Sequence, residues 1–547
     1  MSYVTRGGVH AVFKYMTSFN QLKSVVRLNE LAEEPLDLTD EANFTPKRID
    51  SMTSECLGLK LFYSGERVSE VTLQGLWDLA EETGVLDKMQ NMQSGAVMNS
   101  IEGFPSENRS VLHTAMRDFF ENPNDGEVAK EATKMAYQEL EKLTKFLKNL
   151  EVNDVFTDMV QVGIGGSDLG PRAVYHALKA YEKSKRRAHF ICNVDPDDSA
   201  EVLKDLDLTK TLFVVVSKSG STLETLTNEE FVRERLKKAG LDPKNHIISV
   251  TGKGSPMDDP DRYLASFYIW DFIGGRYSVT SMVGGVILAF SLGMDRFLEF
   301  LRGASAMDKQ ALKNDRKANL PLISALLSVW NRNFLGLSTA AIIPYAQALF
   351  RFPAHLQQLS MESNGKRIDK KGKAVDFDTG AVIWGEPGTN GQHSFFQMIH
   401  QGTSVVPVEF LGFYENQYKE DILYQGTYCQ EKLLANMFAQ SLALSTGQKS
   451  ENPNKVFPGN RSNRILLASK LDPYTLGAIL SYYENSVAFQ GFIWNINSFD
   501  QEGVQLGKHL ALEFTELFAQ KRTKKGIDSK AFPLGSAYFR HLSSYMS

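Results

Sequence analysis

The chain has 547 residues, of which 42% are apolar and 23% charged, and this composition is typical of a folded protein rather than a disordered one. Lys and Arg number 60 and Asp and Glu number 65, so the net charge of −5 argues against a dedicated nucleic-acid-binding protein. The three cysteines, Cys56, Cys192 and Cys429, lie far apart, which argues against a disulfide framework and favours a reducing compartment.

Residues 1–20 contain no apolar segment typical of a signal peptide. The longest apolar stretch, residues 279–294, is shorter than the roughly 20 residues that cross a bilayer, so we expect a buried core helix there. We therefore predict a cytoplasmic protein with no membrane contact and no nucleic-acid partner.

Helices dominate the prediction for the first 150 residues. Apolar residues recur at helical spacing over residues 73–83 and 108–121, and residues 130–150 show a clear amphipathic pattern. No chemical motif stands out before residue 115. We therefore predict an N-terminal helical region, residues 1–115, that packs on the rest of the protein.

Strands and helices alternate between residues 155 and 250. The strand candidates are residues 155–162, 188–194, 211–216 and 246–250, and the helices between them are residues 171–181, 199–206 and 223–238. The third strand is Val-rich on both faces, as buried parallel strands are. This alternation predicts a doubly wound parallel sheet, which we assign to a first α/β domain over residues 116–290.

A second series of strands follows a helical stretch around residues 295–331. Its strand candidates are residues 339–345, 381–384, 405–411 and 464–468, and its helices are residues 349–361, 391–401, 432–444 and 473–484. The predicted fold class is therefore α/β, with two doubly wound parallel-sheet domains and helices on both faces of each sheet. The second domain covers residues 291–515, and a C-terminal tail covers residues 516–547. Such sheets bind ligands at the carboxyl ends of their strands.

The first candidate site is the glycine-rich turn GIGGSDLGP at residues 163–171. It contains Gly166 and Ser167 and leads into a helix, whose N-terminal N–H groups and dipole can hold an anion. A dinucleotide-binding fingerprint would need glycine where Asp168 stands, and a P-loop would need lysine where Pro171 stands. Neither a nicotinamide cofactor nor ATP is supported, and a purely structural turn remains the alternative.

The second candidate site is the hydroxyl-rich segment SKSGST at residues 217–222, which also joins a buried strand to a helix. Ser217, Ser219 and Thr222 offer small hydrogen-bond donors. Lys218 adds a positive charge, and Gly220 lets the backbone approach a ligand. One hydroxyl is enough to cap a helix, so the surplus favours a bound phosphate monoester.

Three further segments carry single ionisable residues in less specific patterns. Arg276 follows two glycines in DFIGGRYS, and His393 follows the loop GEPGTNGQ. Glu362 lies four residues after Gln358, on the same helix face. Each has a structural alternative: an ion pair for Arg276, a solvated helix end for Glu362 and a hydrogen-bonded histidine for His393. His393 and His400 do not have the spacing of a zinc-binding HExxH motif, so we predict no metal site.

The last segment is FDQEGVQLGK at residues 499–508. Gln501, Gln505 and Lys508 fall on one helical face, which places two amides and an ammonium group together. An ordinary surface lysine is the structural alternative for Lys508.

Together these segments resemble the glucose-6-phosphate isomerase family, also called phosphoglucose isomerase, over residues 155–510. DFIGGRYSVTSMVG at 271–284 and GFIWNINSFDQEGVQLGK at 491–508 resemble the two family signatures, with Gln505 where the family has Glu. MESNGK at 361–366 and GTNGQH at 388–393 are the most discriminating matches. SKSGST resembles the phosphosugar-binding loop of sugar isomerase (SIS) domains in general, which makes it a less specific match. The family resemblance implies two domains of this type.

The resemblance implies reversible isomerisation of glucose 6-phosphate to fructose 6-phosphate through an enediol, a step of glycolysis and gluconeogenesis. It makes Glu362 the base that moves a proton between C2 and C1, with Arg276 stabilising the enediolate. His393 assists ring opening, with Lys508 near the ring oxygen. The other implied residues are Ser217, Lys218, Ser219 and Thr222 for the phosphate, Gly166, Ser167, Gln358 and Gln501 for the sugar, and Glu224 for orienting His393.

The resemblance also implies a homodimer in which His393 completes the site of the neighbouring subunit, and a reaction without metal or cofactor. A sugar-phosphate-sensing regulator is one alternative, but it would carry a DNA-binding helix-turn-helix region, and residues 1–115 show no compelling one. A glutamine-dependent aminosugar synthase is another, but its type of amidotransferase domain needs an N-terminal cysteine where Ser2 stands.

Overall fold

The computed structural model describes residues 18–523, 532–542 and 545. The chain divides into two compact units, Met1–Ser498 and Phe499–Ser547. Part of the predicted tail, residues 524–531, 543–544 and 546–547, lies outside the described residues. The predicted domain boundaries after residues 115, 290 and 515 stay predictions.

The first sheet of the first unit is fully parallel, with the strand order β6-β5-β7-β8-β9. Its strands are β5 (Asp158–Val162), β6 (Arg187–Ile191), β7 (Thr211–Ser217), β8 (Ile247–Thr251) and β9 (Ala265–Tyr268). Every residue of β5, β7 and β8 is buried, as expected for central parallel strands. The four predicted strands are confirmed, and β9 is an additional edge strand that the sequence analysis missed.

Helices cover both faces of this sheet. They are α5 (Glu127–Asn153), α6 (Leu169–Ala177), α7 (Pro196–Leu203), α8 (Leu223–Lys238) and α9 (Met282–Leu292). Valine and isoleucine side chains from β5, β6, β7 and β8 form one core cluster with residues of α7 and α8. The predicted helix over residues 199–206 begins earlier, because Asp195 caps α7 and Pro196 occupies its first turn.

The second sheet has the order β1-β2-β15-β12-β10-β11. Its strands are β1 (Thr53–Cys56), β2 (Leu59–Phe62), β10 (Thr339–Pro344), β11 (Val382–Trp384), β12 (Val408–Glu415) and β15 (Asn463–Lys470). The four predicted strands are confirmed and run parallel. The hairpin β1–β2, which was not predicted, adds an antiparallel edge through β15. Its turn residues Leu57 and Gly58 both have positive φ, as a two-residue hairpin turn requires.

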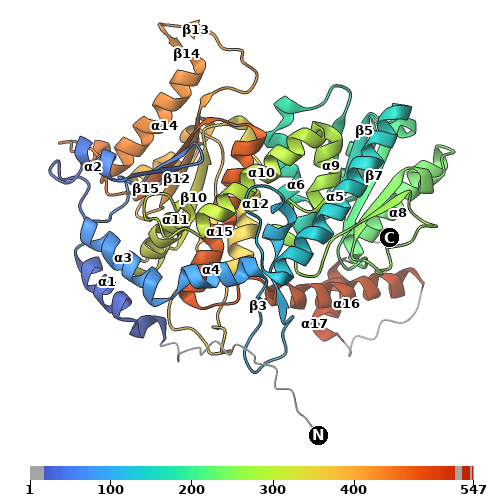
Figure 1. Cartoon of the computed structure of the whole chain (residues 1–547), viewed down its shortest axis with the longest axis horizontal. Coiled ribbons are helices and arrows are strands. Elements are labelled where there is room, and N and C mark those ends of the chain that lie inside the picture. Colours follow the sequence, from blue (N-terminus) through green and yellow to red (C-terminus); the bar gives the residue numbers. More distant parts are fainter. Residues whose placement is uncertain (1–17, 524–531, 543–544, 546–547) are drawn as a thin grey trace. The chain divides into compact units, whose positions relative to one another are not determined.

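Helices of the second series are α10 (Met294–Ala311), α11 (Leu320–Val329), α12 (Phe352–Gln357), α13 (Phe396–Gln401), α14 (Cys429–Thr446) and α15 (Pro473–Trp494). In Figure 1, α10 and α15 lie between the two sheets, and the two helices pack on each other. The predicted single helix over residues 349–361 is instead α12 followed by a π-helical turn, Gln358–Glu362. The predicted helix over residues 391–401 is a 3₁₀ turn, Asn390–His393, followed by α13.

The N-terminal region contains α1 (Lys23–Glu33), α2 (Pro46–Ser51), α3 (Glu70–Glu82), α4 (Val85–Ser94), β3 (Val97–Asn99) and β4 (Arg109–Ser110). The predicted helix over residues 73–83 is confirmed by α3. The predicted helix over residues 108–121 is wrong, since the segment holds β4 and a short 3₁₀ turn, His113–Arg117. Asn108 has φ +49°, which breaks any helix there, although Leu112 and Met116 are buried as the pattern suggested.

The apolar stretch at residues 279–294 forms α9, every residue of which is buried. This confirms the predicted core helix. None of the helices in the described residues combines the length and the apolar character that crossing a bilayer requires.

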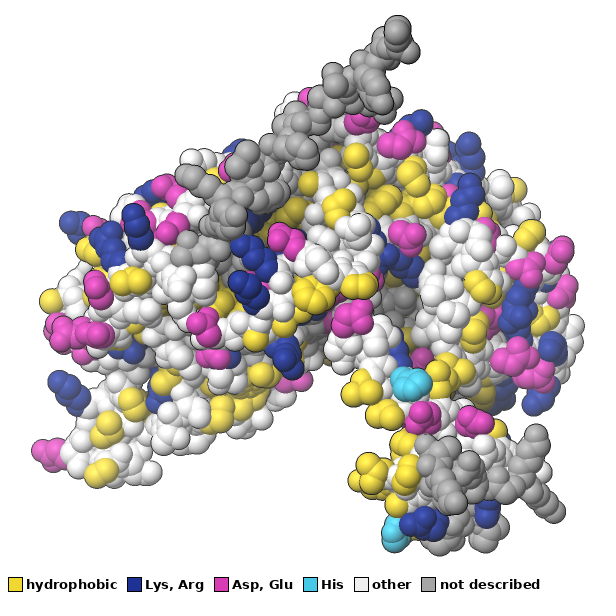
Figure 2. Space-filling model, turned by 90° about the horizontal axis from the view of Figure 1, so that it is seen from below, with side chains coloured by type: hydrophobic (Ala, Val, Ile, Leu, Met, Phe, Trp, Pro, Cys, Tyr) yellow, Lys and Arg dark blue, Asp and Glu magenta, His cyan; other side chains and the backbone are white. Residues whose placement is uncertain are grey.

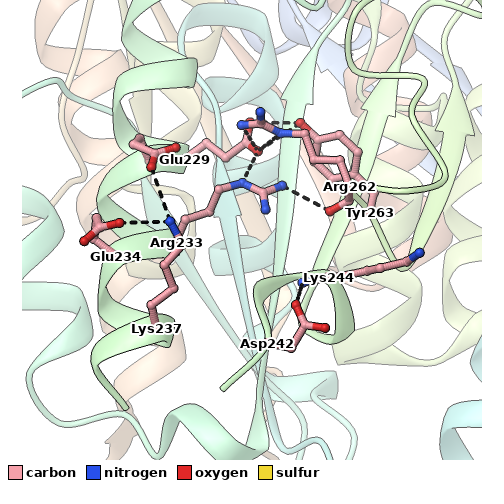
Figure 3. Close-up of polar contacts among 9 residues, drawn as sticks. Glu229, Arg233, Glu234, Lys237, Asp242, Lys244, Arg262 and Tyr263 are labelled. Carbon is pink, nitrogen blue, oxygen red and sulfur yellow. Dashed lines mark hydrogen bonds and ion pairs between the residues drawn. The ribbon is translucent and has the colours of Figure 1, made fainter. Parts of the chain in front are cut away.

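A buried cluster of charged residues fixes α8 to the connection between β8 and β9. Glu229 accepts hydrogen bonds from Arg233 (2.7 Å), from Arg262 (2.9 Å) and from the hydroxyl of Tyr263 (2.9 Å). Figure 3 shows these four side chains converging. The carboxylate of Glu229 is fully buried, and its desolvation is offset by these charged and polar donors. The cluster therefore holds the helix whose first turn follows the segment SKSGST.

The described residues of the second unit include α16 (Gln505–Arg522) and α17 (Pro533–Leu542), which pack through aromatic pairs such as Phe518 with Phe539. On the face of the molecule shown in Figure 2, basic and acidic side chains are interspersed. That face carries no broad patch of one sign, in keeping with the near balance of charges in the sequence.

Candidate active site

The two loops predicted to bind anions follow neighbouring strands. The glycine-rich turn follows β5 and the segment SKSGST follows β7, and these strands pair in the middle of the first sheet. In the order β6-β5-β7-β8-β9, the chain reverses its direction of winding between β5 and β7. Doubly wound sheets open a crevice at such a point, outside the carboxyl ends of the strands.

The glycine-rich turn touches the loop that carries Arg276. Residues Gly165–Ser167 form a 3₁₀ turn, and a Cβ atom built on Gly166 would lie 2.2 Å from the carbonyl oxygen of Gly275. No side chain fits at that position, so Gly166 is required for the contact between the two loops. The side chain of Ser167 is half-buried beside it.

The segment SKSGST presents two pairs of hydroxyls at the start of α8. The hydroxyls of Ser217 and Thr222 lie 2.9 Å apart, and Ser221 donates to Ser219 at 2.9 Å. Gly220 has φ +67° and allows the tight turn between them. Small donors and the helix dipole are therefore concentrated at one end of α8.

The ammonium group of Lys218 is not free to bind beside these hydroxyls. Its ammonium group donates to the carbonyl oxygens of Asp271 and Ile273, each at 2.9 Å. Burial, reinforced by the nearby charge of Arg109, lowers the pKa of Lys218 to about 8. The side chain thus bridges the segment SKSGST to the loop of Arg276.

Arg276 is almost fully buried and is held on three sides. Its Nε donates to Ser363 Oγ at 2.7 Å, and its Nη2 donates to the carbonyl oxygen of Ser498. Its Nη1 lies 3.4 Å from Oε2 of Glu362. The side chain of Glu362 is 21% exposed, so the carboxylate is accessible while the guanidinium beneath it is fixed.

Gln358 begins the π-helical turn that Glu362 ends, and it reaches back to the glycine-rich turn. Its Nε2 lies 3.4 Å from the place a Cβ of Gly165 would occupy. Its Oε1 is buried and has no hydrogen-bond partner among the described residues. A buried amide oxygen of this kind costs free energy unless a ligand or water donates to it.

The structure does not bring His393 into this group. His393 is exposed on the second-sheet side, where it lines a surface pocket of about 410 Å³ together with His400 and Gln440. Within the described residues, no hydrogen bond or ion pair links it to Glu362 or to the half-buried Glu224 in the first turn of α8. Likewise, no cluster of three metal-binding side chains occurs in that part of the chain.

Gln501 and Lys508 belong to the second unit. Gln501 precedes a 3₁₀ turn, Glu502–Val504, and Lys508 lies in the first turn of α16. The expectation that Gln501 shares a continuous helix with Lys508 is therefore wrong. Their roles at the substrate stay predictions.

Sequence reasoning missed the residues that hold Arg276. Ser363 also contacts the hydroxyl of Tyr277 at 3.1 Å, and Tyr277 stacks on His113 with ring centroids 4.5 Å apart. The only signal for Ser363 in the sequence is its position directly after Glu362. The carbonyl of Ser498 gives no signal, because any residue would supply it.

A family model described as phosphoglucose isomerase matches residues 62–534, which is most of the chain. The chain belongs to the phosphoglucose isomerase family. This confirms the resemblance drawn from the sequence motifs, and it identifies the chain as a sugar-phosphate isomerase.

Individual members of the phosphoglucose isomerase family match nearly the whole chain. A glucose-6-phosphate isomerase of Protochlamydia amoebophila is 58% identical over 520 residues, covering 95% of this chain and 96% of the relative. One from Desulfotalea psychrophila is 54% identical, covering 95% and 98%. A solved glucose-6-phosphate isomerase structure from Chlamydia trachomatis superposes with a TM-score of 0.92 at 47% identity, covering 97% of this chain and 100% of that one. The α/β fold with two parallel-sheet domains is confirmed.

Proposed function

We propose that this chain interconverts glucose 6-phosphate and fructose 6-phosphate, with Glu362 carrying the transferred proton. The observation that supports this most directly is the pair of Glu362 and Arg276, an accessible carboxylate 3.4 Å from a buried guanidinium. The pair is connected through Gly166 and Gln358 to the loops at the switch point of the first sheet. Relatives of more than half identity that carry the name glucose-6-phosphate isomerase support the same substrate.

The chemistry needs one base and one fixed cation. The carboxylate of Glu362 takes the proton from C2 of the open-chain aldose, and the electron pair moves through C1 onto O1 to give an enediolate. The hydroxyl proton of O2 is transferred to O1, and the carboxylate returns its proton to C1, which leaves the ketose. Arg276 cannot lose its charge and is already held in place, so it stabilises the enediolate without reorganising.

The phosphate of the substrate is bound by the hydroxyls of Ser217, Ser219 and Thr222 at the N-terminus of α8. The helix dipole and the hydroxyl donors favour a dianion there. This group does not react, so its binding fixes the orientation of C1 and C2 at Glu362. Gly166, Ser167 and Gln358 contact the sugar, and the unpaired Oε1 of Gln358 accepts from a sugar hydroxyl.

The active form is a homodimer in which His393 opens the sugar ring in the partner's site, oriented there by Glu224. Two observations support this arrangement. His393 is exposed and unlinked to Glu362 within the described residues. The hairpin of β13 (Leu423–Tyr424) and β14 (Thr427–Tyr428) also carries apolar side chains in solvent, with Leu423 and Tyr424 each 62% exposed, and a second copy would cover them.

The decisive experiment is an isomerase assay that couples fructose 6-phosphate consumption to glucose 6-phosphate detection. Wild-type protein is expected to be active, also after exhaustive chelation of metals. Glu362→Gln removes the base but keeps the size of the side chain, so kcat should fall by about 10²–10⁴-fold. Glu131→Gln, at an exposed carboxylate of α5 (62%), is the matched control and should retain full activity. Near wild-type activity in Glu362→Gln would exclude the proton-transfer role.

A further inference from the structure

The bridge formed by Lys218 has a geometry that does not fit a phosphate ligand. The segment SKSGST faces the proposed phosphate site, but the ammonium group of Lys218 is bonded to two main-chain carbonyls of another loop, those of Asp271 and Ile273. An ammonium group has three N–H bonds. Two of them are used in this bridge, so one at most is available to a ligand.

The bridge fixes a short stretch of main chain from one side while the N-terminal region fixes it from the other. Lys218 bonds the carbonyls of Asp271 and Ile273, and the N–H of Leu112 donates to the intervening carbonyl of Phe272 at 3.0 Å. Three consecutive carbonyls are thus engaged. Arg276 lies three residues after Ile273, so the position of this stretch determines where the guanidinium lies.

The charges around Lys218 are balanced rather than strongly attractive. Arg109 faces it with a like charge, and Glu107 and Asp271 oppose that charge. Arg109 is itself close to Glu107 and lies 3.9 Å from a carboxylate oxygen of Asp271. The ammonium group is therefore retained by its two carbonyl acceptors and by its burial among these groups, since no carboxylate of the described residues forms an ion pair with it.

We propose that Lys218 is a positioning residue, whose side chain holds the loop of Arg276 against the phosphate-binding segment, and that it is not a ligand of the substrate phosphate. This inference deepens the proposed isomerase function and rests on it. It assigns phosphate binding to the hydroxyls and main-chain N–H groups of the segment. It also gives the segment a second task, since the same residues that hold the non-reacting phosphate support the cation at the reacting carbons.

The kinetic test compares Lys218→Met with Ser219→Ala. A displaced guanidinium should cost Lys218→Met up to about 100-fold in kcat, because small misplacements of a catalytic group are expensive. The KM for fructose 6-phosphate and the inhibition constant of inorganic phosphate should stay within about twofold of wild type, since phosphate binding is untouched. Ser219→Ala should do the opposite, raising both constants with little change in kcat. Lys204→Met, at an exposed lysine (53%), is the matched control.

Two outcomes would overturn the proposal. One is a rise in KM and in the phosphate inhibition constant of Lys218→Met with kcat unchanged, which would make Lys218 a phosphate ligand. The other is wild-type behaviour in all three constants.

A crystal structure of wild-type protein with inorganic phosphate tests the same point without a substitution. The ammonium group should remain within hydrogen-bond distance of both carbonyls, and its transfer to a phosphate oxygen would contradict the proposal. This measurement also separates the two ideas: an inactive wild-type protein would defeat the proposed function, whereas the position of Lys218 beside bound phosphate would still decide the role of the side chain.

Discussion

Ser363 joins the two charged residues of the candidate site. Its hydroxyl accepts from Arg276 Nε at 2.7 Å, and its main chain directly follows Glu362. A shift of Ser363 would therefore move the guanidinium and the carboxylate together. The spacing of 3.4 Å between them depends on a residue that is fully buried and touches no solvent.

Replacing Ser363 with alanine should disorder Arg276 without removing any charge. A hydrogen bond to a charged group contributes about 1.5–3 kcal/mol, so we expect kcat to fall by roughly 10- to 100-fold. Steady-state kinetics with fructose 6-phosphate will measure this, with Ser51→Ala at an exposed serine as the control. An unchanged kcat in Ser363→Ala would mean that the other contacts of Arg276 suffice.

Residue-level prediction is most specific where the chemistry is concentrated in a motif. Ser217, Ser219 and Thr222 are predicted to bind phosphate because the segment has more hydroxyls than helix capping needs. The role of Glu362 is predicted only through the resemblance, since a carboxylate at a helix end is common. Lys218 was assigned to the phosphate by its charge, and the sequence could not show that its partners are main-chain carbonyls more than fifty residues away.

At the scale of elements, the hairpin β13–β14 is rigidly attached to α14. Asp421 accepts hydrogen bonds from the main-chain N–H groups of Cys429 and Gln430, and these bonds lower the pKa of the Asp421 carboxyl. Lys432 donates to the carbonyls of Tyr424 and Thr427. A hairpin fixed in this way presents its apolar side chains in a defined orientation, which favours a specific interface over loose association.

Substitution of both Leu423 and Tyr424 by aspartate should disrupt the proposed dimer. Burying a carboxylate in an apolar interface costs several kcal/mol, so the double substitution of Leu423 and Tyr424 by aspartate should yield monomers at micromolar protein concentration. Sedimentation velocity measures the state, and activity should fall with it because His393 would be lost from the site. Val152→Asp, at a valine that is 85% exposed at the end of α5, is the control. Dimers that persist in the double variant would exclude this hairpin as the interface.

Elements with a strong local pattern were predictable, and those decided by distant partners were not. The central strands β5, β7 and β8 are apolar throughout, because they are buried on both faces. The edge strand β9 and the hairpin β1–β2 have mixed burial, and their pairing depends on strands elsewhere in the chain. The π-helical turn at Gln358–Glu362 keeps helical spacing, so periodicity alone could not distinguish it from an α-helix.

For the molecule as a whole, two buried histidines contribute to the loss of stability in acid. His355 is enclosed with no partner for either ring nitrogen among the described residues, and burial lowers its pKa to about 4. Burial together with Arg117 lowers the pKa of His113 to about 3. Each histidine stays neutral in the folded state while the unfolded chain takes up a proton below pH 6.5. The contribution of these two histidines to stability is therefore complete above that pH and is lost as the pH falls towards these lowered values.

Glu484 has the opposite effect on the pH dependence of stability over part of this pH range. Burial raises its pKa to about 7, although its ion pair with Arg117 opposes the shift. The folded state therefore holds a proton on Glu484 between about pH 4.5 and 7 that the unfolded chain has released, and stability gains as the pH falls through this window.

His355→Leu should reduce the loss of unfolding free energy as the pH falls from 7 to 5. One histidine contributes about 1.4 kcal/mol per pH unit between its unfolded and folded pKa, so wild type should lose roughly 2 kcal/mol more than the variant between pH 7 and pH 5. Urea unfolding at both pH values measures the difference, with His541→Gln at an exposed position as the control. Parallel pH profiles for wild type and His355→Leu would show that His355 does not contribute.

The antiparallel edge of the second sheet links distant parts of the chain, since Phe62 in β2 pairs with Ile465 in β15. This pairing has a consequence for biosynthesis. The first sheet lies within residues 158–268 and can assemble while translation continues. The hairpin β1–β2 is made early, but β15, the strand that pairs with the open edge of β2, leaves the ribosome only about 400 residues later. Until then the unpaired edge of the hairpin can pair with other chains. The fold is therefore most vulnerable to aggregation during synthesis, when unfinished chains are crowded together on polysomes.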